Sequence, residues 1–311
     1  MSVKRDIFRE GIVSGICRGW GSFIWVLKIL VPISFLTALL EWSGVFNRID
    51  FLMQPVMSWF GLPAIAALPL MIGLITGIYG GIAAMVVLPF TKEQMTLMAI
   101  FMMIAHNLIQ EGLIQGKSGF HPLKAVSFRL GAAILTVMVV GQMINSAPMT
   151  IAMEGTSVLI SPTFVEILKT WSISTLHITA KIFVIMMGVL TLLEMLKTLG
   201  WIPHIVSKFT PFLRLLGLSQ KVGILWITGA VFGLAYGAAV IFEEIKEGNL
   251  TREELEGLHL SIGINHSIIE DPSLFLAMGL SAFWLWVPRL IMAILVVRLV
   301  SLWQLVIRKR I

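Results

Sequence analysis

The most constraining feature of this sequence is a series of apolar stretches that are long enough to cross a lipid bilayer as helices. A crossing helix needs about 20 mostly apolar residues. Six segments meet that requirement, at roughly 21–42, 63–89, 122–145, 171–196, 221–242 and 281–305. Apolar residues make up 57% of the chain and Asp, Glu, Lys and Arg only 13%, whereas an average soluble protein is roughly 25% charged. We therefore expect an all-α, polytopic transmembrane helical bundle, multi-pass in the cell membrane.

Composition also excludes several functional classes. The formal net charge of +6 comes from Lys and Arg in short loops between apolar stretches, which is how membrane proteins encode orientation, so no nucleic-acid partner is expected. The single cysteine, Cys17, excludes a disulfide framework and a thiolate metal site within one chain. Phosphate-loop, nucleophile-elbow and HExxH motifs are absent, so the sequence predicts no enzyme. The lipid bilayer is the first expected partner.

The chain is internally duplicated. Shifts of 156 and then 160 residues superpose rare residues in the same order. The matched pairs are Pro55/Pro211, Gly61/Gly217, Gly73/Gly229, Gly77/Gly233, Gly81/Gly237, Thr91/Thr251, Glu93/Glu253, His106/His266 and Arg129/Arg289. We predict a cytoplasmic segment 1–20, a transmembrane repeat 21–145, an external linker 146–170, a second repeat 171–305 and a basic cytoplasmic tail 306–311.

Two further apolar helices decide the orientation of the repeats. Segments 93–111 and 252–271 either span the membrane, which makes the halves parallel, or are re-entrant, which makes them inverted. The re-entrant arrangement concentrates Lys and Arg more strongly on one side, as the positive-inside rule favours. We therefore expect two inverted repeats and cytoplasmic N- and C-termini, with Lys117 inside and Lys246 outside. Segments 46–60 and 201–216 mix aromatic, apolar and basic residues, which predicts one interfacial helix in each repeat.

The polar ends of the two expected re-entrant helices are the candidate site. They read HNLIQEG (106–112) and NHSIIEDP (265–272), each with a histidine, a polar residue four positions later, an acid and then a helix breaker. Ionisable groups inside a membrane are costly and usually functional. The alternative is that the histidines only hydrogen-bond neighbouring helices while the acids lie near the surface. The predicted substrate-binding residues are His106, Asn107, Gln110, Glu111, Asn265, His266, Glu270, Asp271, Tyr79 and Tyr236.

Three further features concern ions and packing. His266 and Glu270, four residues apart on one helical face, have the spacing of metal ligands, and coupling to H⁺ or Na⁺ through the same groups is the competing interpretation. Arg129 and Arg289 either pair with Glu111 or Asp271 or extend to the interface.

Six glycines at four-residue spacing, three in each half, predict close helix packing, with local unwinding beside the polar tips as the alternative. They are Gly73, Gly77, Gly81, Gly229, Gly233 and Gly237.

The glycine-rich stretches GLPAIAALPLMIGLITGIYGGIAAM (61–85) and GLSQKVGILWITGAVFGLAYGAAVI (217–241) carry a family resemblance. With their flanks they resemble the nucleoside-recognition, or Gate, domain of concentrative nucleoside transporters and of the membrane part of ferrous-iron permeases. The chain lacks the polar hairpin tip of the nucleoside transporters, and it lacks the GTP-binding domain and membrane cysteines of the iron permeases. The resemblance implies a transport protein.

The sequence therefore predicts a transporter that moves a small polar or ionic solute, for example a nucleoside, by ion-coupled alternating access. The alternatives are a divalent-metal permease of the ferrous-iron kind and a non-transporting membrane scaffold or receptor. No resident cofactor is expected, although a divalent metal fits the candidate residues. A homodimer is a further expectation from such folds.

Overall fold

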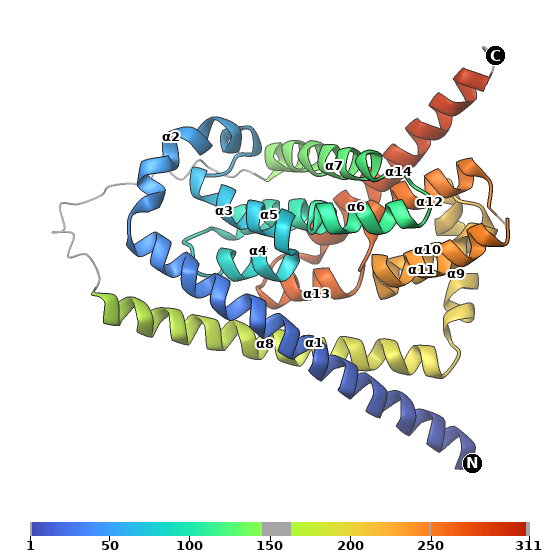
Figure 1. The fold of residues 1–311 in the computed structure, drawn as a ribbon, viewed down its shortest axis with the longest axis horizontal. Coiled ribbons are helices and arrows are strands. Elements are labelled where there is room, and N and C mark those ends of the chain that lie inside the picture. The colour runs from blue at the N-terminus through green and yellow to red at the C-terminus, as the bar shows by residue number, and fades with distance from the viewer. Residues whose placement is uncertain (1, 145–162, 249, 309–311) are drawn as a thin grey trace.

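A computed structural model describes residues 2–144, 163–248 and 250–308, and all regular secondary structure in these ranges is helical (Figure 1). The expected linker 146–170 lies largely outside the described residues. The α-helices are α1 Ser2–Trp42, α2 Val45–Met57, α3 Ala67–Thr76, α4 Ile78–Met85, α5 Lys92–Ala105, α6 Leu108–Lys117, α7 Pro122–Met143, α8 Phe164–Thr198, α9 Ile202–Leu215, α10 Gln220–Phe232, α11 Leu234–Lys246, α12 Arg252–Asn265, α13 Glu270–Ala277 and α14 Ala282–Arg308. Short 3₁₀ turns lie at Ser58–Phe60 and Ala64–Ala66.

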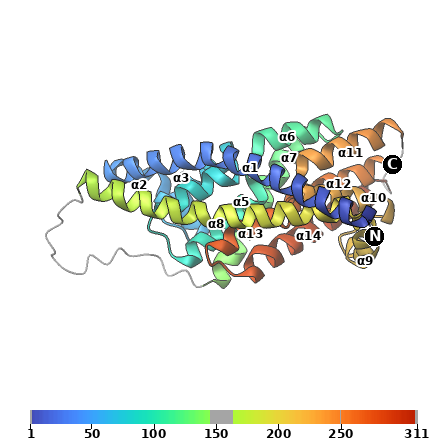
Figure 2. The ribbon, with the colours of Figure 1, turned by 90° about the horizontal axis from the view of Figure 1, so that it is seen from below.

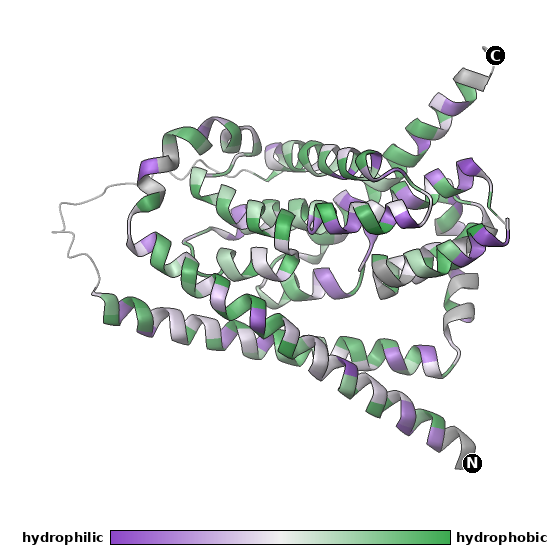
Figure 3. Ribbon diagram, viewed as in Figure 1, coloured by the Kyte–Doolittle hydropathy of each residue, from purple (hydrophilic) through white to green (hydrophobic). Residues whose placement is uncertain are grey.

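Five helical segments in the described ranges are long and apolar enough to cross a membrane, which supports the multi-pass prediction. They are Asp6–Trp42, Lys92–Lys117, Pro122–Met143, Phe164–Thr198 and Ala282–Val306. A sixth candidate is a pair of helices, Phe51–Phe60 and Ala64–Thr76, bent by 83°. Large apolar side chains such as Trp59, Val165 and Trp303 are at least two-thirds exposed, as expected where lipid is the solvent. Apolar residues cover most helices, and hydrophilic ones gather near the end that holds both termini (Figure 3).

The long helices α1 and α8, which open the two halves, pack side by side and antiparallel (Figures 1 and 2). Gly15 lies against the Thr191 backbone at one end of the pair. At the other end the Trp42 and Phe164 rings lie 5.5 Å apart, and Trp171 Nε1 donates to Ser34 Oγ at 3.1 Å. Glycine in α1 permits this close approach because it has no side chain to separate the two backbones.

Residues 63–89 and 221–242 do not form the expected continuous spans. Gly77 ends α3 with φ 96°, and α4 then packs back against α3. A Cβ on Gly81 would lie 3.3 Å from the Gly73 Cα. In the second half Gly233, at φ 92°, separates α10 from α11, and Gly237 lies against the Gly229 backbone. Each glycine ladder therefore closes a helical hairpin, because positive φ at its middle glycine reverses the chain and the outer glycines let the arms meet.

The segments expected to be re-entrant are instead interrupted helices. Helices α5 and α6 continue past a break at His106 and Asn107 and together form the candidate crossing Lys92–Lys117. In the second half α12 and α13 are likewise separated by a break, at residues 266–269. Segment 93–111, expected to be re-entrant, thus lies within a candidate crossing, and in both halves the chain reverses in the glycine ladder that precedes the broken helix.

Each end of the molecule contains one turn from each half. At the end near both termini, Gly119 lies against Ile245 and Leu255, and Lys124 Nζ lies 3.0 Å from Glu256 Oε1. At the opposite end, Gly279 lies beside Lys92. The expectation that Lys117 and Lys246 lie on opposite sides is therefore not met, because Gly119, two residues after Lys117, packs against Ile245, next to Lys246.

Candidate functional site

Both interrupted helices break at a residue with left-handed backbone conformation. Asn107 and Ser267 each have φ 49°, and they are the non-glycine residues with positive φ in the described chain. Each break is held by the neighbouring hairpin. The Asn107 amide donates to the Gly73 carbonyl at 3.0 Å, and the Ile268 amide donates to the Ala230 carbonyl at 2.7 Å. The hairpins therefore satisfy backbone groups that no water would reach inside a membrane.

The two buried arginines bind the carbonyl ends of the broken helices. Arg129 donates through Nε to the Ile104 carbonyl at 2.9 Å and through Nη2 to the His106 carbonyl at 2.9 Å. Arg289 donates through Nε to the Ile264 carbonyl at 3.2 Å and through Nη2 to the His266 carbonyl at 2.9 Å. The last carbonyls of a helix lack intrahelical partners, and one planar guanidinium reaches two of them. These arginines therefore stabilise the breaks.

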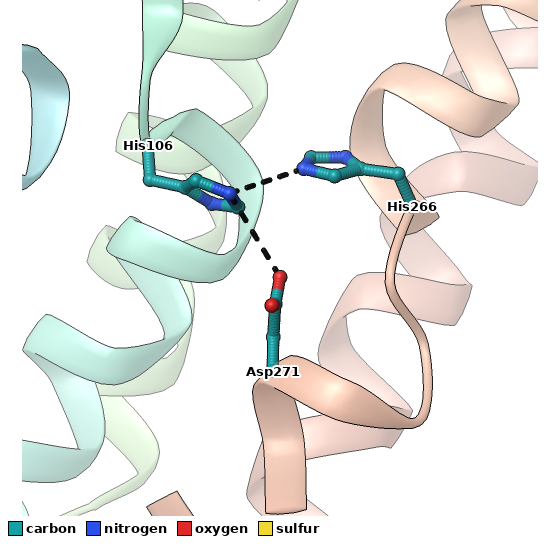
Figure 4. Close-up of side chains that lie close together, drawn as sticks. All are labelled: His106, His266 and Asp271. Carbon is teal, nitrogen blue, oxygen red and sulfur yellow. Dashed lines mark hydrogen bonds and ion pairs between the residues drawn. The ribbon is translucent and has the colours of Figure 1, made fainter. Parts of the chain in front are cut away.

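The breaks bring His106 and His266 opposite each other with their Nε2 atoms facing, and Asp271 lies below them (Figure 4). The two Nε2 atoms lie 3.4 Å apart, and His106 Nε2 lies 3.9 Å from Asp271 Oδ2. All three side chains are buried, and their nearest ligand atoms lie within 4.8 Å of one another. The matched histidines of the two halves thus form one centre.

Glu111 completes this centre from the first half. Its Oε2 lies 3.2 Å from His266 Nε2 and 2.6 Å from Arg129 Nη1, and its Oε1 lies 3.5 Å from His106 Nε2. Glu111 is therefore paired with Arg129, whereas the described chain shows no ion pair within 4.0 Å between Asp271 and Arg289. Asp271 Oδ2 makes no hydrogen bond among the described residues. We refer to His106, His266, Glu111 and Asp271 as the central cluster.

Hydrogen bonds fix which histidine nitrogens face the centre. His106 Nδ1 lies 2.8 Å from the Met102 carbonyl and His266 Nδ1 lies 3.2 Å from the Gly263 carbonyl. A carbonyl oxygen only accepts, so Nδ1 carries the proton in both rings and a neutral ring turns an Nε2 lone pair toward the centre. With two carboxylates beside them, the facing atoms of the central cluster are acceptors. Such an arrangement requires a proton or another cation between them.

The polar residues four positions after each histidine do not join the cluster. Gln110 is exposed, and Glu270 instead accepts a hydrogen bond of 2.6 Å from the Tyr79 hydroxyl. The described residues whose ligand atoms lie close enough to hold one metal ion are instead His106, His266 and Asp271. The prediction assumed an unbroken helix between the two residues, whereas the left-handed residue after each histidine rotates the next helix, so that the fifth residue faces the ring.

The remaining predicted residues have varied surroundings. Asn107 lies against Gly77 at the first hairpin tip, and Asn265 is buried one residue before the second break. The side chain of Tyr236 lies outside the described part of the chain. Sequence reasoning missed the role of the arginines as backbone ligands, although one signal was present: each follows its histidine by 23 residues.

The apolar helices, the paired hairpins and the buried polar centre define a multi-pass helical membrane protein. Residues 23–114 match the model of the Gate family, described as nucleoside recognition, which confirms the expected resemblance for that part of the chain. The chain is also 26% identical over 298 residues to the uncharacterized membrane protein YvoD of Bacillus subtilis (strain 168), covering 94% of this chain and 93% of that protein. No solved structure gives a significant match.

Proposed function

We propose that this protein is a membrane transporter that moves a small polar or ionic solute by alternating access, with a cation at the central cluster as coupling ion or cargo. The observation that carries this proposal is the convergence of acceptor atoms from both halves on one buried point. His106 and Glu111 come from the first half, and His266 and Asp271 from the second. Buried polar groups at broken helices are the usual construction of a transporter site.

The proposed topology has six crossings and two hairpins that enter from opposite ends. The crossings are α1, α5–α6, α7, α8, α12–α13 and α14, so each half contributes three. An odd number of crossings per half makes the repeats inverted. Basic residues support this arrangement, because Arg48, Lys92 and Lys169 lie toward the end with α2, whereas the other end contains a larger set. That set includes Lys117, Lys124, Lys197, Lys208, Arg214, Lys246 and Arg252. The positive-inside rule then makes this second end, with both termini, cytoplasmic.

A cation at this centre would couple the halves directly. Bound between His106 and His266, the cation would attract groups from both halves. It would therefore stabilise the closed state, in which the two histidines lie next to each other. Without it, facing lone pairs and carboxylates would repel each other and favour separation on one side. A ligand shifts a conformational equilibrium only by its differential affinity for the two states, and here that difference arises from acceptors that are close together only in the closed state.

Two alternatives follow from other observations. The family description of nucleoside recognition supports an organic solute, with the cation as coupling ion. A non-transporting scaffold is the second alternative, for which the central cluster would only tie the halves together. Thermal stabilisation of the purified protein by a panel of nucleosides and ions would separate organic from ionic ligands, because selective binding to the folded state raises its stability.

Transient currents from proteoliposomes on a solid-supported membrane test transport itself. We expect a rapid jump in cation concentration to move charge in the wild type and in His177→Ala, which removes an exposed histidine of α8. His266→Ala and Asp271→Asn should abolish the current while the protein still elutes as a folded species in size-exclusion chromatography. Equal currents in all four proteins, or none in the wild type with any cation or nucleoside of the panel, would contradict the proposal.

A further inference from the structure

The geometry points to a specific kind of cation: we infer that the central cluster is a binding site for a divalent transition-metal ion, with His106 Nε2, His266 Nε2 and Asp271 Oδ2 as its protein ligands. This inference rests on the proposed function for its placement of a cation at this centre. It adds the chemical class of that cation, which decides whether the transported or coupling species is a proton, an alkali ion or a metal.

The two histidine nitrogens that face each other have the spacing of metal ligands. Ligand atoms about 2.0–2.1 Å from a tetrahedral ion lie about 3.3–3.4 Å from each other. The two Nε2 atoms are 3.4 Å apart, and Asp271 Oδ2 lies 3.9 Å from His106 Nε2. The pair of histidines is therefore already set at the separation that one metal ion would span.

The histidines are also oriented as metal ligands are. A ligating histidine usually donates its other ring N–H to a backbone carbonyl or a carboxylate, which fixes the tautomer and the ring orientation. His106 does so to Met102 and His266 to Gly263. Both carbonyls belong to the helices that the breaks terminate, so the same backbone that positions each ring also leaves its Nε2 lone pair free.

Asp271 is the group that most needs a cation. Its side chain is buried and its Oδ2 makes no hydrogen bond among the described residues. A buried carboxylate oxygen without a hydrogen bond is unfavourable, and the one ion-pair contact of Asp271 Oδ2 in the described chain is the 3.9 Å approach of His106 Nε2. Glu111, by contrast, is already held by Arg129 at 2.6 Å. We therefore assign Asp271 as the carboxylate ligand and Glu111 as a neighbouring charge that remains with Arg129.

The surrounding charge favours a positive ion. Glu111, Glu270 and Asp271 lie at or next to the centre, opposite Arg129 and Arg289, so the formal charge of these five groups is −1. Imidazole and carboxylate ligands select ions such as Zn²⁺, Fe²⁺, Co²⁺ and Mn²⁺ rather than Na⁺ or Cu⁺. The only cysteine, Cys17, is exposed on α1 and supplies no thiolate to the central cluster.

Metal binding can be measured without transport. Purified full-length protein in detergent would be titrated with Co²⁺, whose visible absorption reports ligand geometry, and then with Zn²⁺ as competitor. We expect one ion per chain, a rise in melting temperature, and displacement of Co²⁺ by Zn²⁺. His266→Ala and the nearly isosteric Asp271→Asn should weaken Co²⁺ binding at least 100-fold, whereas His177→Ala should bind as the wild type does.

The outcomes separate this inference from the proposed function. Wild-type protein that binds neither Co²⁺ nor Zn²⁺ would overturn the inference, as would a variant set in which Asp271→Asn and His177→Ala bind equally well. If the protein binds the metal but shows no ion-dependent current, the metal site is supported and the transport proposal is contradicted. If the protein binds no metal but a pH jump alone drives a current, the transport proposal stands and the transported or coupling cation is a proton.

Discussion

At the scale of single residues, two arginine guanidiniums donate to backbone carbonyls at the ends of two broken helices, where the helix itself provides no N–H partner. Arg129 and Arg289 occupy matched positions, yet their surroundings differ, because Arg129 also pairs with Glu111 while Arg289 bonds only to carbonyls among the described residues. The centre is thus asymmetric: Glu111 is held by its arginine, whereas Asp271 makes no ion pair within 4.0 Å with Arg289 among the described residues.

Replacing Arg129 by Met is expected to lower the free energy of unfolding by about 3–5 kcal/mol, because it leaves Glu111 as an unpaired buried charge. The double variant Arg129→Met/Glu111→Gln should recover part of that loss. Arg298→Met is the matched control, since Arg298 is exposed although it also donates to carbonyls; it should cost about 1 kcal/mol or less. Denaturant unfolding in detergent measures all three, and an equal effect in Arg129→Met and the control would contradict the assigned role.

Tyr79 provides a second test at this scale, because its hydroxyl joins the first hairpin to Glu270 of the second half. Tyr79→Phe should lower the unfolding free energy by about 1.5–3 kcal/mol, the usual contribution of a hydrogen bond to a charged group. In a double-mutant cycle with Glu270→Gln the two effects should be non-additive. Full additivity would mean that the two side chains do not interact in the folded protein.

At the scale of elements, the hairpins depend on glycines that no other residue can replace. The α10–α11 arms approach so closely that a Cβ on Gly237 would lie 2.5 Å from the Gly229 Cα. The α3–α4 hairpin has the same construction at Gly73 and Gly81. Close packing, one of the two roles considered for these ladders, is what the arms show, while the chain reversal falls on Gly77 and Gly233.

Gly237→Ala should therefore separate the two arms and lower the melting temperature of the protein. Gly188→Ala in α8 is the matched control, because nothing lies within 4 Å of a Cβ at that position. There the substitution should be neutral or stabilise the helix by up to about 1 kcal/mol, since alanine is the better helix former. If both variants melt at the same temperature, the close contact between α10 and α11 does not exist.

At the scale of the whole molecule, the proposed topology has three crossings per half, which would make the repeats inverted and place matched loops at opposite ends. In a Cys17→Ser background, Lys117→Cys and Lys246→Cys should react with a membrane-impermeant maleimide from the same side. Lys92→Cys and Ser281→Cys should react from the other. Labelling in intact cells and in inverted vesicles measures this, and reaction of Lys117→Cys and Lys246→Cys from different sides would refute the proposed topology.

How much was predictable from the sequence differs between elements and site. Apolar segments long enough to span a bilayer predicted a helical membrane protein, and the matched rare residues predicted that His106 and His266 would occupy equivalent places. The same hydropathy could not distinguish a crossing from a hairpin, because 63–89 and 93–111 are both apolar and of similar length. The prediction therefore chose the wrong segment of each half as the one that turns back.

Taken alone, the sequence determined the lipid surroundings, the helical class and the duplication, because these depend on composition and on register along the chain. The tertiary structure decided which helix reverses and which acid meets the histidines. Both depend on backbone torsion at single residues: positive φ at Gly77 and Gly233 closes the hairpins, and positive φ at Asn107 and Ser267 turns Glu111 and Asp271, rather than Gln110 and Glu270, toward the centre. Such torsions are selected by packing between distant segments, which no local pattern of residues records.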